Sequence, residues 1–162
     1  EQRQVQSTAN FNVKFLFFSA YRYQHTNTER WADDCLLRFD AKTNVNGEPT
    51  EVSGQTGDAG FVVKKSDSQE LLPGCIMSFA YWNHEFLKKE RLLNPQTGEF
   101  MDDDVELMGA ETLEVRGQKI AAQRYRITAK DIDLLVWYSN DDEWLGLESV
   151  AKTGHIIRYE LS

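Results

Sequence analysis

Apolar and polar residues alternate along most of this chain, which is the pattern of β-strands with one buried face. The stretch from Phe11 to Cys35 shows it most clearly, because its odd positions up to Tyr23 form one mainly apolar face. We predict one long strand here, covered on both sides at its centre, which leads into a polar turn and a second strand. The apolar positions are Phe11, Val13, Phe15, Phe17, Tyr21 and Tyr23 on one face, and Leu16, Phe18 and Ala20 on the other.

Turn signals separate the other apolar runs. Asn46-Gly47, Thr97-Gly98, Arg116-Gly117 and Thr153-Gly154 each place a glycine where a positive φ is expected. The runs between these signals predict strands at 31–44, 61–65, 113–116, 119–128, 132–139, 143–152 and 155–161. The last three strands form an antiparallel meander, with one apolar face and one mixed face.

The segment 82–92 departs from this alternation and has helical character. Asn83 is a plausible N-cap, and Glu85 and Lys89 have the spacing of a favourable pair on one helix face. One short helix cannot cover a whole sheet, so the sheet must curl or leave a concave face partly open. We therefore predict a single all-β domain over 1–162, a strongly curved antiparallel half-barrel meander with one short helix at its mouth or concave side.

Composition narrows the class of protein. The chain has 162 residues, enough for a real core, and a net charge of −8 from 18 basic and 26 acidic side chains. An acidic surface disfavours binding to nucleic acid, and no apolar run reaches the roughly 20 residues of a transmembrane helix. The chain starts at Glu1 without a Met or an apolar leader, as expected of a processed form or of a fragment.

Two cysteines, Cys35 and Cys75, are present. They predict one disulfide, with two buried thiols as the alternative, and they lack the spacing of a redox-active Cys-x-x-Cys pair. A bridge between them would contribute about 4 kcal/mol in the chain-entropy model.

Several segments carry a family resemblance. They are Tyr21-x-Tyr23-x-His25-x-x-x-Glu29-x-Trp31-x-x-x-Cys35-Leu36, Gly74-Cys75, Tyr81-Trp82-Asn83, Leu92-Leu93-Asn94-Pro95-Gln96-Thr97-Gly98 and Trp137-Tyr138. With these segments the chain resembles the uncharacterised exported bacterial family catalogued as domain of unknown function 6134. The resemblance implies a secreted or periplasmic β-protein, similar in style to the half-barrels of periplasmic lipoprotein carriers.

The resemblance also bears on the amino-terminal end. Members of this family usually begin with a further strand or hairpin before the stretch at Phe11, whereas only ten mostly polar residues precede it here. Either this member is short, or the given chain lacks that strand or hairpin. In the second case one sheet edge is open and can pair with another chain.

Aromatic residues make up 12% of the chain, which is more than core filling usually requires. Their rings can line an apolar cavity that binds a lipid or another apolar small molecule, or they can close the core, and both alternatives stay open. The predicted ligand-binding residues are Tyr21, Tyr23, Trp31, Trp82, Asn83, Trp137 and Tyr138, and Trp144 is a further candidate for the same lining.

Signals for catalysis and metal binding are weak. His25 and Glu29 can form an acid–base pair if they face each other across the predicted turn, but the sequence shows no nucleophile elbow. His25, His84 and His155 do not have metal-ligand spacing. Asp102 to Asp104 lack the pattern of an EF-hand and predict a solvated acidic loop. We therefore expect no catalytic residue, metal or cofactor.

These observations favour an exported, non-enzymatic binding or carrier protein with an aromatic-lined apolar cavity, located in the periplasm or secreted. One alternative is an envelope module that docks on a protein partner through a sheet edge or the acidic loop. A second alternative is a hydrolase that uses His25 and Glu29.

Overall fold

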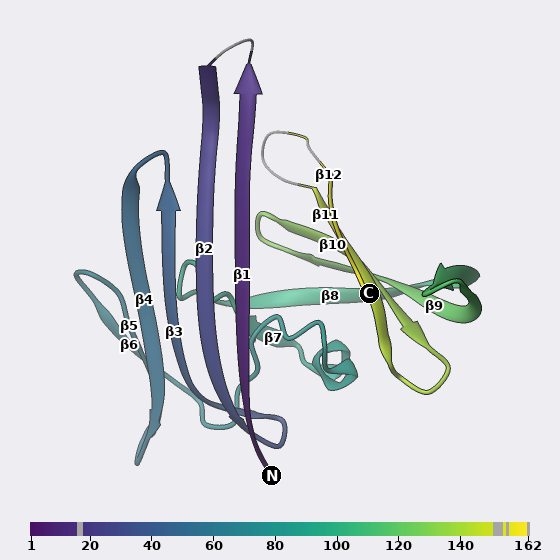
Figure 1. Ribbon diagram of the computed structural model, residues 1–162. Helices are drawn as coiled ribbons and strands as arrows, with labels where there is room; N and C mark the ends of the chain where they lie inside the picture. Colours follow the sequence, from purple (N-terminus) through teal and green to yellow (C-terminus); the bar gives the residue numbers. More distant parts are fainter. Residues whose placement is uncertain (16–17, 151–153, 155, 162) are drawn as a thin grey trace. The chain divides into compact units, whose positions relative to one another are not determined.

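The computed structural model describes residues 1–15, 18–150, 154 and 156–161. Within these residues the chain forms two six-stranded antiparallel sheets and one short 3-10 helix (Figure 1). The predicted all-β fold, a curled antiparallel arrangement with one short helix, is confirmed.

Each strand of the first sheet pairs with the next one along the chain. Its strands are β1 (Gln2–Phe15), β2 (Phe18–Ala32), β3 (Cys35–Val45), β4 (Glu48–Gly57), β5 (Gly60–Lys64) and β6 (Gln69–Leu72). The second sheet has the order β12-β11-β10-β9-β8-β7. Its strands are β7 (Arg91–Leu93), β8 (Phe100–Val115), β9 (Gln118–Ala129), β10 (Ile132–Ser139), β11 (Trp144–Val150) and β12 (Ile156–Glu160). The 3-10 helix η1 (His84–Lys88) precedes β7.

The chain divides into two compact units. Unit 1 consists of Glu1–Ser78 and Leu93–Phe100, and unit 2 consists of Phe79–Leu92 and Met101–Ser162. The expectation of one domain over 1–162 stays a prediction.

The glycine turns form as the sequence predicts. In the β3–β4 hairpin Asn46 and Gly47 have φ values of 53° and 93°, and in the β8–β9 hairpin Arg116 and Gly117 have 52° and 75°. Two successive positive φ values are typical of tight turns whose twist matches that of antiparallel strands. The meander of β10, β11 and β12 is confirmed as well.

The single long strand predicted from Phe11 through Tyr23 is wrong. β1 ends at Phe15 and β2 begins at Phe18, so Phe11 and Tyr23 are register partners on neighbouring strands. Leu16 and Phe17 lie outside the described residues. The polar positions 24–30 belong to β2 and form no turn. Their even positions are exposed or half-buried, whereas His25, Asn27 and Glu29 on the other face are half-buried or buried and have hydrogen-bond partners.

The acidic loop predicted at Asp102 to Asp104 is also wrong. Asp102 to Asp104 lie within β8, where Asp103 and Asp104 are register partners of Ala129 and Thr128, and the predicted loop is absent. Pairing with β9 overrides the low strand propensity of aspartate, which depends strongly on context.

The helical segment is shorter than predicted. It is a single 3-10 turn, and the predicted cap is confirmed because the Asn83 side chain accepts a hydrogen bond from the Glu85 backbone N–H at 3.1 Å. Glu85 pairs with Lys88 at 2.7 Å instead of with Lys89. The 3-10 geometry aligns residues i and i+3, which explains the change of partner.

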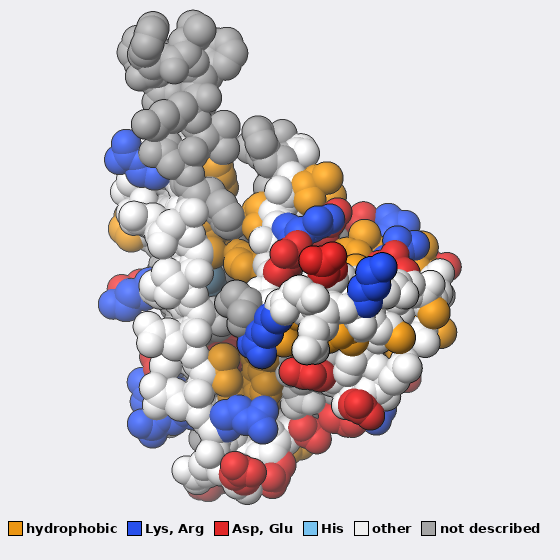
Figure 2. Space-filling model, turned by 45° about the vertical axis from the view of Figure 1, so that its right-hand side comes forward, with side chains coloured by type: hydrophobic (Ala, Val, Ile, Leu, Met, Phe, Trp, Pro, Cys, Tyr) orange, Lys and Arg blue, Asp and Glu red, His pale blue; other side chains and the backbone are white. Residues whose placement is uncertain are grey.

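Charged side chains are mixed over the surface. On the face shown in Figure 2 acidic and basic groups lie next to each other. In the second sheet Arg126 pairs with Asp133 at 2.8 Å, and Arg158 pairs with Glu148 at 2.6 Å. Exposed pairs of this kind contribute little to stability, because solvent and salt screen them.

The turn Asn94–Glu99 fills part of the inner face of the first sheet. It is closed by the Gly98 N–H, which donates to the Asn94 carbonyl at 2.8 Å. Gly98 has a φ of +73°, and a Cβ there would lie 2.9 Å from Val52 and 3.0 Å from Val63. Both the backbone conformation and the close approach therefore require glycine at this position.

Replacing Gly98 by alanine is expected to lower the free energy of unfolding by about 2–3 kcal/mol, through left-handed backbone strain together with overpacking. The matched control is Gly117→Ala, because Gly117 has a φ of +75° and nothing lies within 4 Å of a Cβ there. That variant should lose only the backbone part, about 1 kcal/mol. Urea denaturation of both variants measures the difference, and equal losses would show that the loop does not pack as described.

Candidate functional site

The inward face of β2 carries a row of aromatic and polar side chains in unit 1. Tyr21, Tyr23 and His25 are half-buried, and Asn27, Glu29 and Trp31 are buried. The rings of Tyr21 and Tyr23 stack at 6.4 Å, and those of Tyr23 and His25 at 6.3 Å. The exposure of the side chains therefore falls along the row, from a half-buried end at Tyr21 to a fully buried, dry end at Trp31.

Glu29 is the charged centre of the dry end and is only 5% exposed. Its carboxylate accepts hydrogen bonds from Asn27 Nδ2 at 2.7 Å and from Trp31 Nε1 at 3.0 Å. Burial raises the pKa of Glu29, and hydrogen bonds from Asn27, Ser78 and Trp31 partly offset that rise. Asn27 Oδ1 is buried without a hydrogen-bond partner. This cluster fixes β2 to the segment at Ser78.

The acid–base pair of the hydrolase alternative, which needs His25 and Glu29 to face each other across a turn, does not form. His25 and Glu29 lie four residues apart on one continuous strand, which separates them by about 13 Å. His25 Nδ1 is 2.8 Å from Thr43 Oγ1, and burial lowers the pKa of the imidazole. Glu29 therefore does not orient His25.

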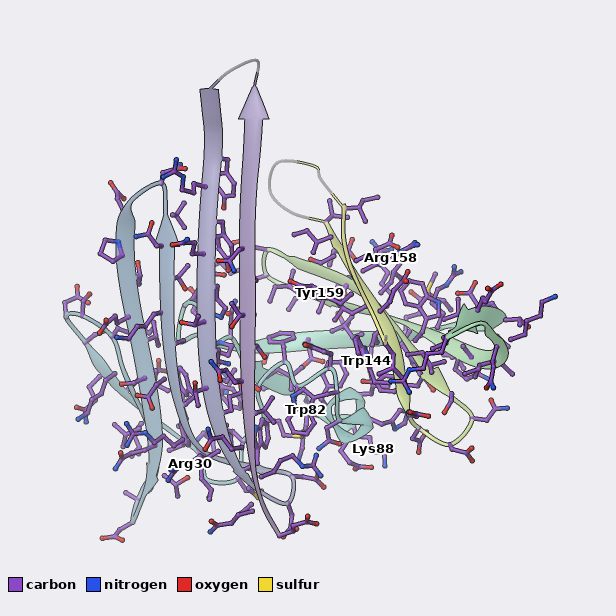
Figure 3. The ribbon with its side chains drawn as sticks, viewed as in Figure 1. Arg30, Trp82, Lys88, Trp144, Arg158 and Tyr159 are labelled. Atoms are coloured by element: carbon purple, nitrogen blue, oxygen red, sulfur yellow. A yellow bond between two sulfur atoms is a disulfide. The ribbon has the colours of Figure 1, made fainter. Side chains whose placement is uncertain are left out.

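Unit 2 contains a larger group of rings, which we call the aromatic cluster. Its members are Tyr81, His84, Tyr125, Tyr138, Trp144 and Tyr159. They come from the segment that ends in η1 and from β9, β10, β11 and β12. Figure 3 labels Trp144 and Tyr159 on their strands, together with Trp82 near η1.

The inner half of the aromatic cluster surrounds Tyr138, which is 1% exposed. His84 meets this ring edge-on at 4.8 Å, and Tyr125 meets it edge-on at 6.2 Å. The Tyr138 hydroxyl donates to the Tyr81 carbonyl, and this hydrogen bond links the segment before η1 to β10. Burial, followed by the charges of Tyr125 and Asp142, raises the pKa of Tyr138, so the phenol is neutral across the physiological range.

The outer half consists of three half-buried rings. Tyr81 packs on Trp144 at 5.1 Å and on Tyr159 at 6.5 Å. Burial and the neighbouring Tyr81 raise the pKa of Tyr159, which also stays neutral. These rings form an uncharged surface with a partly open edge.

Two ring nitrogens of the aromatic cluster are buried and have no hydrogen-bond partner within the described residues. They are His84 Nδ1 and Trp144 Nε1. His84 Nε2 faces Asp142 Oδ1 at 3.3 Å. The indole N–H can only donate, so Trp144 Nε1 is a buried donor that no described group satisfies.

The predicted site residues are divided between the units. Tyr138 belongs to the aromatic cluster, and Trp82 and Asn83 lie in the segment before η1, whereas Tyr21, Tyr23 and Trp31 lie in unit 1. Trp137 occupies the opposite face of β10, in a small core with Val115, Ala122 and Leu145. Its indole N–H donates to Glu111.

Four members of the aromatic cluster were not among the predicted ligand-binding residues. They are Tyr81, His84, Tyr125 and Tyr159. Tyr125 and Tyr159 share a face with Val136 and Leu147 through strand register, a relation that period-two alternation within one strand cannot reveal.

Other polar features lie outside the aromatic cluster. Both carboxylate oxygens of Asp103 are buried without a partner, and burial, with Asp104 and Asp102 nearby, raises its pKa to about 6. The described residues hold no group of three or more metal-ligating side chains. A hollow of about 270 Å³ on the first sheet is lined by Gln4, Thr28, Arg30, Arg38 and Asp40. None of these features offers an aromatic lining.

The two cysteines form a disulfide, which decides between the two alternatives left open by the sequence. Next to it the Leu36 N–H donates to the Ile76 carbonyl at 2.9 Å. The bond therefore joins the beginning of β3 to the segment that follows β6. Within the described part of the chain, no helix has the length and apolar character needed to span a membrane.

Comparisons with known proteins give one match. Neither the curated proteins nor the solved structures include a significant match to this chain. One family model, described as a domain of unknown function (DUF6134), matches residues 1–162. The resemblance noted in the sequence is confirmed, and the chain belongs to the DUF6134 family.

Proposed function

We propose that the protein is a non-enzymatic binding or carrier protein that takes up an apolar small molecule on the aromatic cluster of unit 2. The observation that carries this proposal is the set of six contacting rings with two unpartnered ring nitrogens. Small-molecule sites typically combine apolar and aromatic surface with a few polar groups that fix orientation.

The two halves of the aromatic cluster have different roles in this proposal. Tyr138 and its neighbours form a rigid base, because edge-to-face ring contacts and a hydrogen bond fix them. Tyr81, Trp144 and Tyr159 are half-buried and provide the contact surface. The ligand would have a planar or lipid-like apolar body that packs on these three rings.

The compartment is part of the proposal. Disulfides persist in oxidising compartments, so the Cys35–Cys75 bond is consistent with a periplasmic or secreted protein of the bacterial envelope. A carrier in that compartment would hold apolar molecules away from water without changing them.

Binding of the neutral fluorescent probe N-phenyl-1-naphthylamine tests the proposal. The wild-type chain should bind it with a micromolar dissociation constant, and Trp144→Ala should weaken binding about tenfold or more, because a large aromatic contact surface is lost. The control is Tyr21→Ala, a half-buried ring of unit 1 with a stacked neighbour. It should leave binding within about twofold of the wild type.

Two outcomes would contradict the proposal. One is that the wild-type chain shows no saturable binding of the probe. The other is that Tyr21→Ala weakens binding as much as Trp144→Ala, which would place the ligand on unit 1. Circular dichroism of each variant establishes that the fold is intact. Native mass spectrometry after incubation with envelope lipid extract then identifies the natural class of ligand.

No observation favours the hydrolase alternative, since His25 and Glu29 have separate partners. The alternative of docking through a sheet edge has a structural basis in β1.

A further inference from the structure

β1 is an edge strand of unusual length. It pairs with β2 from Gln2 to Phe15, and no other strand among the described residues pairs with it. The side of β1 that faces away from β2 therefore presents a row of backbone N–H and C=O groups without strand partners. Such a row is a template for pairing with another strand.

The other edge strands are short. β6 has 4 residues, β7 has 3 and β12 has 5, whereas β1 has 14. Natural proteins protect edges by shortness, charge, proline or bulges. The run from Gln4 to Val13 has no charged residue, proline or glycine, and the only register irregularity lies at its end, between Val13 and Lys14. This edge lacks every one of those protections over ten residues.

We propose that β1 pairs antiparallel with β1 of a second copy of the chain, around a two-fold axis at Thr8. Opposed residues of antiparallel strands point to the same face, so the axis must pass through a residue position. An axis at Thr8 overlaps the two strands from Gln2 to Lys14, and no other axis through a residue position gives a longer overlap within β1. The opposed pairs would be Thr8 with Thr8, Ser7 with Ala9, Gln6 with Asn10, Val5 with Phe11, and Gln4 with Asn12.

The side-chain pattern suits this arrangement. Gln6, Thr8 and Asn10 are exposed on one face of β1, and Val5 and Ala9 are half-buried on the other. Pairing two copies in this register continues both faces across the axis. Threonine opposite threonine is a favourable cross-strand pair.

The distribution of charge is compatible with a second copy at this edge. Each chain carries a net charge of −8, so two copies repel each other over most approaches. The run from Gln4 to Val13 brings no like charges together, and Arg3 would stand opposite Val13. This inference goes beyond the proposed ligand binding and does not depend on it.

Sedimentation equilibrium of the 162-residue chain, from about 5 to about 200 µM, tests the pairing. A single-strand interface is small, so a dissociation constant of tens of micromolar is expected. Thr8→Lys places two lysines opposite each other at the axis and should raise that constant about tenfold or more. The matched control is Thr26→Lys, because Thr26 is the exposed register partner of Thr8 on β2, one strand away from the edge. It should change the constant less than about twofold.

Cross-linking gives a second, independent measurement. Both native cysteines are in the disulfide, so an added cysteine is the one free thiol. Thr8→Cys should form a covalent dimer under mild oxidation, whereas Thr26→Cys should not, because its two copies would lie about 14 Å apart. A monomeric wild type at about 200 µM would overturn the proposal. So would a dimer that Thr8→Lys and Thr26→Lys weaken equally, or one that Thr8→Cys fails to cross-link.

Discussion

Replacing both Cys35 and Cys75 by serine is expected to lower the free energy of unfolding of unit 1 by about 4 kcal/mol. The bond joins residues 40 apart and closes a loop that contains β3, β4, β5 and β6. Without it the unfolded chain gains the conformational freedom of that loop, and the folded state does not. Most domains have a total stability of only about 5–15 kcal/mol, so this loss is a large share of the total.

Hydrogen exchange measured in increasing urea separates the two units. Peptides from β3 to β5 report on unit 1, and peptides from β9 and β10 report on unit 2. The reduced wild-type chain is the control for the serine substitutions, because it lacks the bond but keeps both cysteines. Both forms should lose protection in unit 1 at a lower urea concentration. Unchanged protection there would mean that the bond does not constrain the loop.

Glu29→Gln is expected to cost about 2–4 kcal/mol of folding free energy. The buried carboxylate accepts hydrogen bonds from Asn27, Trp31 and Ser78. A glutamine has one acceptor oxygen, and its NH2 group would face a donor of Asn27 or Trp31. At least one buried N–H would then lose its partner, although the size of the side chain barely changes.

Glu51→Gln is the matched control for this substitution. Glu51 is 71% exposed and pairs with Lys42 on the surface at 3.2 Å. Its loss should cost less than about 1 kcal/mol, because exposed ion pairs contribute little. Urea denaturation of both variants at the same pH compares the costs. If Glu29→Gln unfolds at the same urea concentration as Glu51→Gln, the buried cluster does not support the first sheet as described.

Local signals in the sequence predicted several elements correctly. Asn46-Gly47 and Arg116-Gly117 form the tight turns of two hairpins, because the backbone conformation of such turns is encoded in two residues. Asn83 caps η1 for a similarly local reason. The alternation of apolar residues from Ile132 onward predicted the final meander.

The first hairpin could not be predicted in the same way. Apolar residues occupy both sides of the break between Phe15 and Phe18, so the sequence there carries no polar turn signal. The polar residues that did suggest a turn, among them Asn27 and Glu29, are buried in a hydrogen-bonded cluster. Their partner Ser78 comes from a distant part of the chain. The local pattern of apolar and polar residues does not reveal partners that are distant in the sequence.

The candidate site was predicted in part. Tyr138 was among the predicted ligand-binding residues, and its neighbour Trp137 faces the other side of the sheet, as period-two alternation requires. The contact between Tyr138 and His84 depends on where η1 lies on the second sheet. No spacing within one element encodes that contact, so tertiary packing was needed to find it.

Unit 1 consists of two segments that are separated in the sequence, and this affects the order in which the chain folds. Its last piece, Leu93–Phe100, follows the whole segment Phe79–Leu92 of unit 2. A chain that emerges amino terminus first exposes β1 to β6 before the turn at Asn94–Glu99 is available to cover Val52 and Val63. During that interval the inner face of the first sheet is an uncovered apolar surface, the kind of surface that holdase chaperones bind. Unit 1 therefore completes its core only after residue 100 of the 162 has been synthesised.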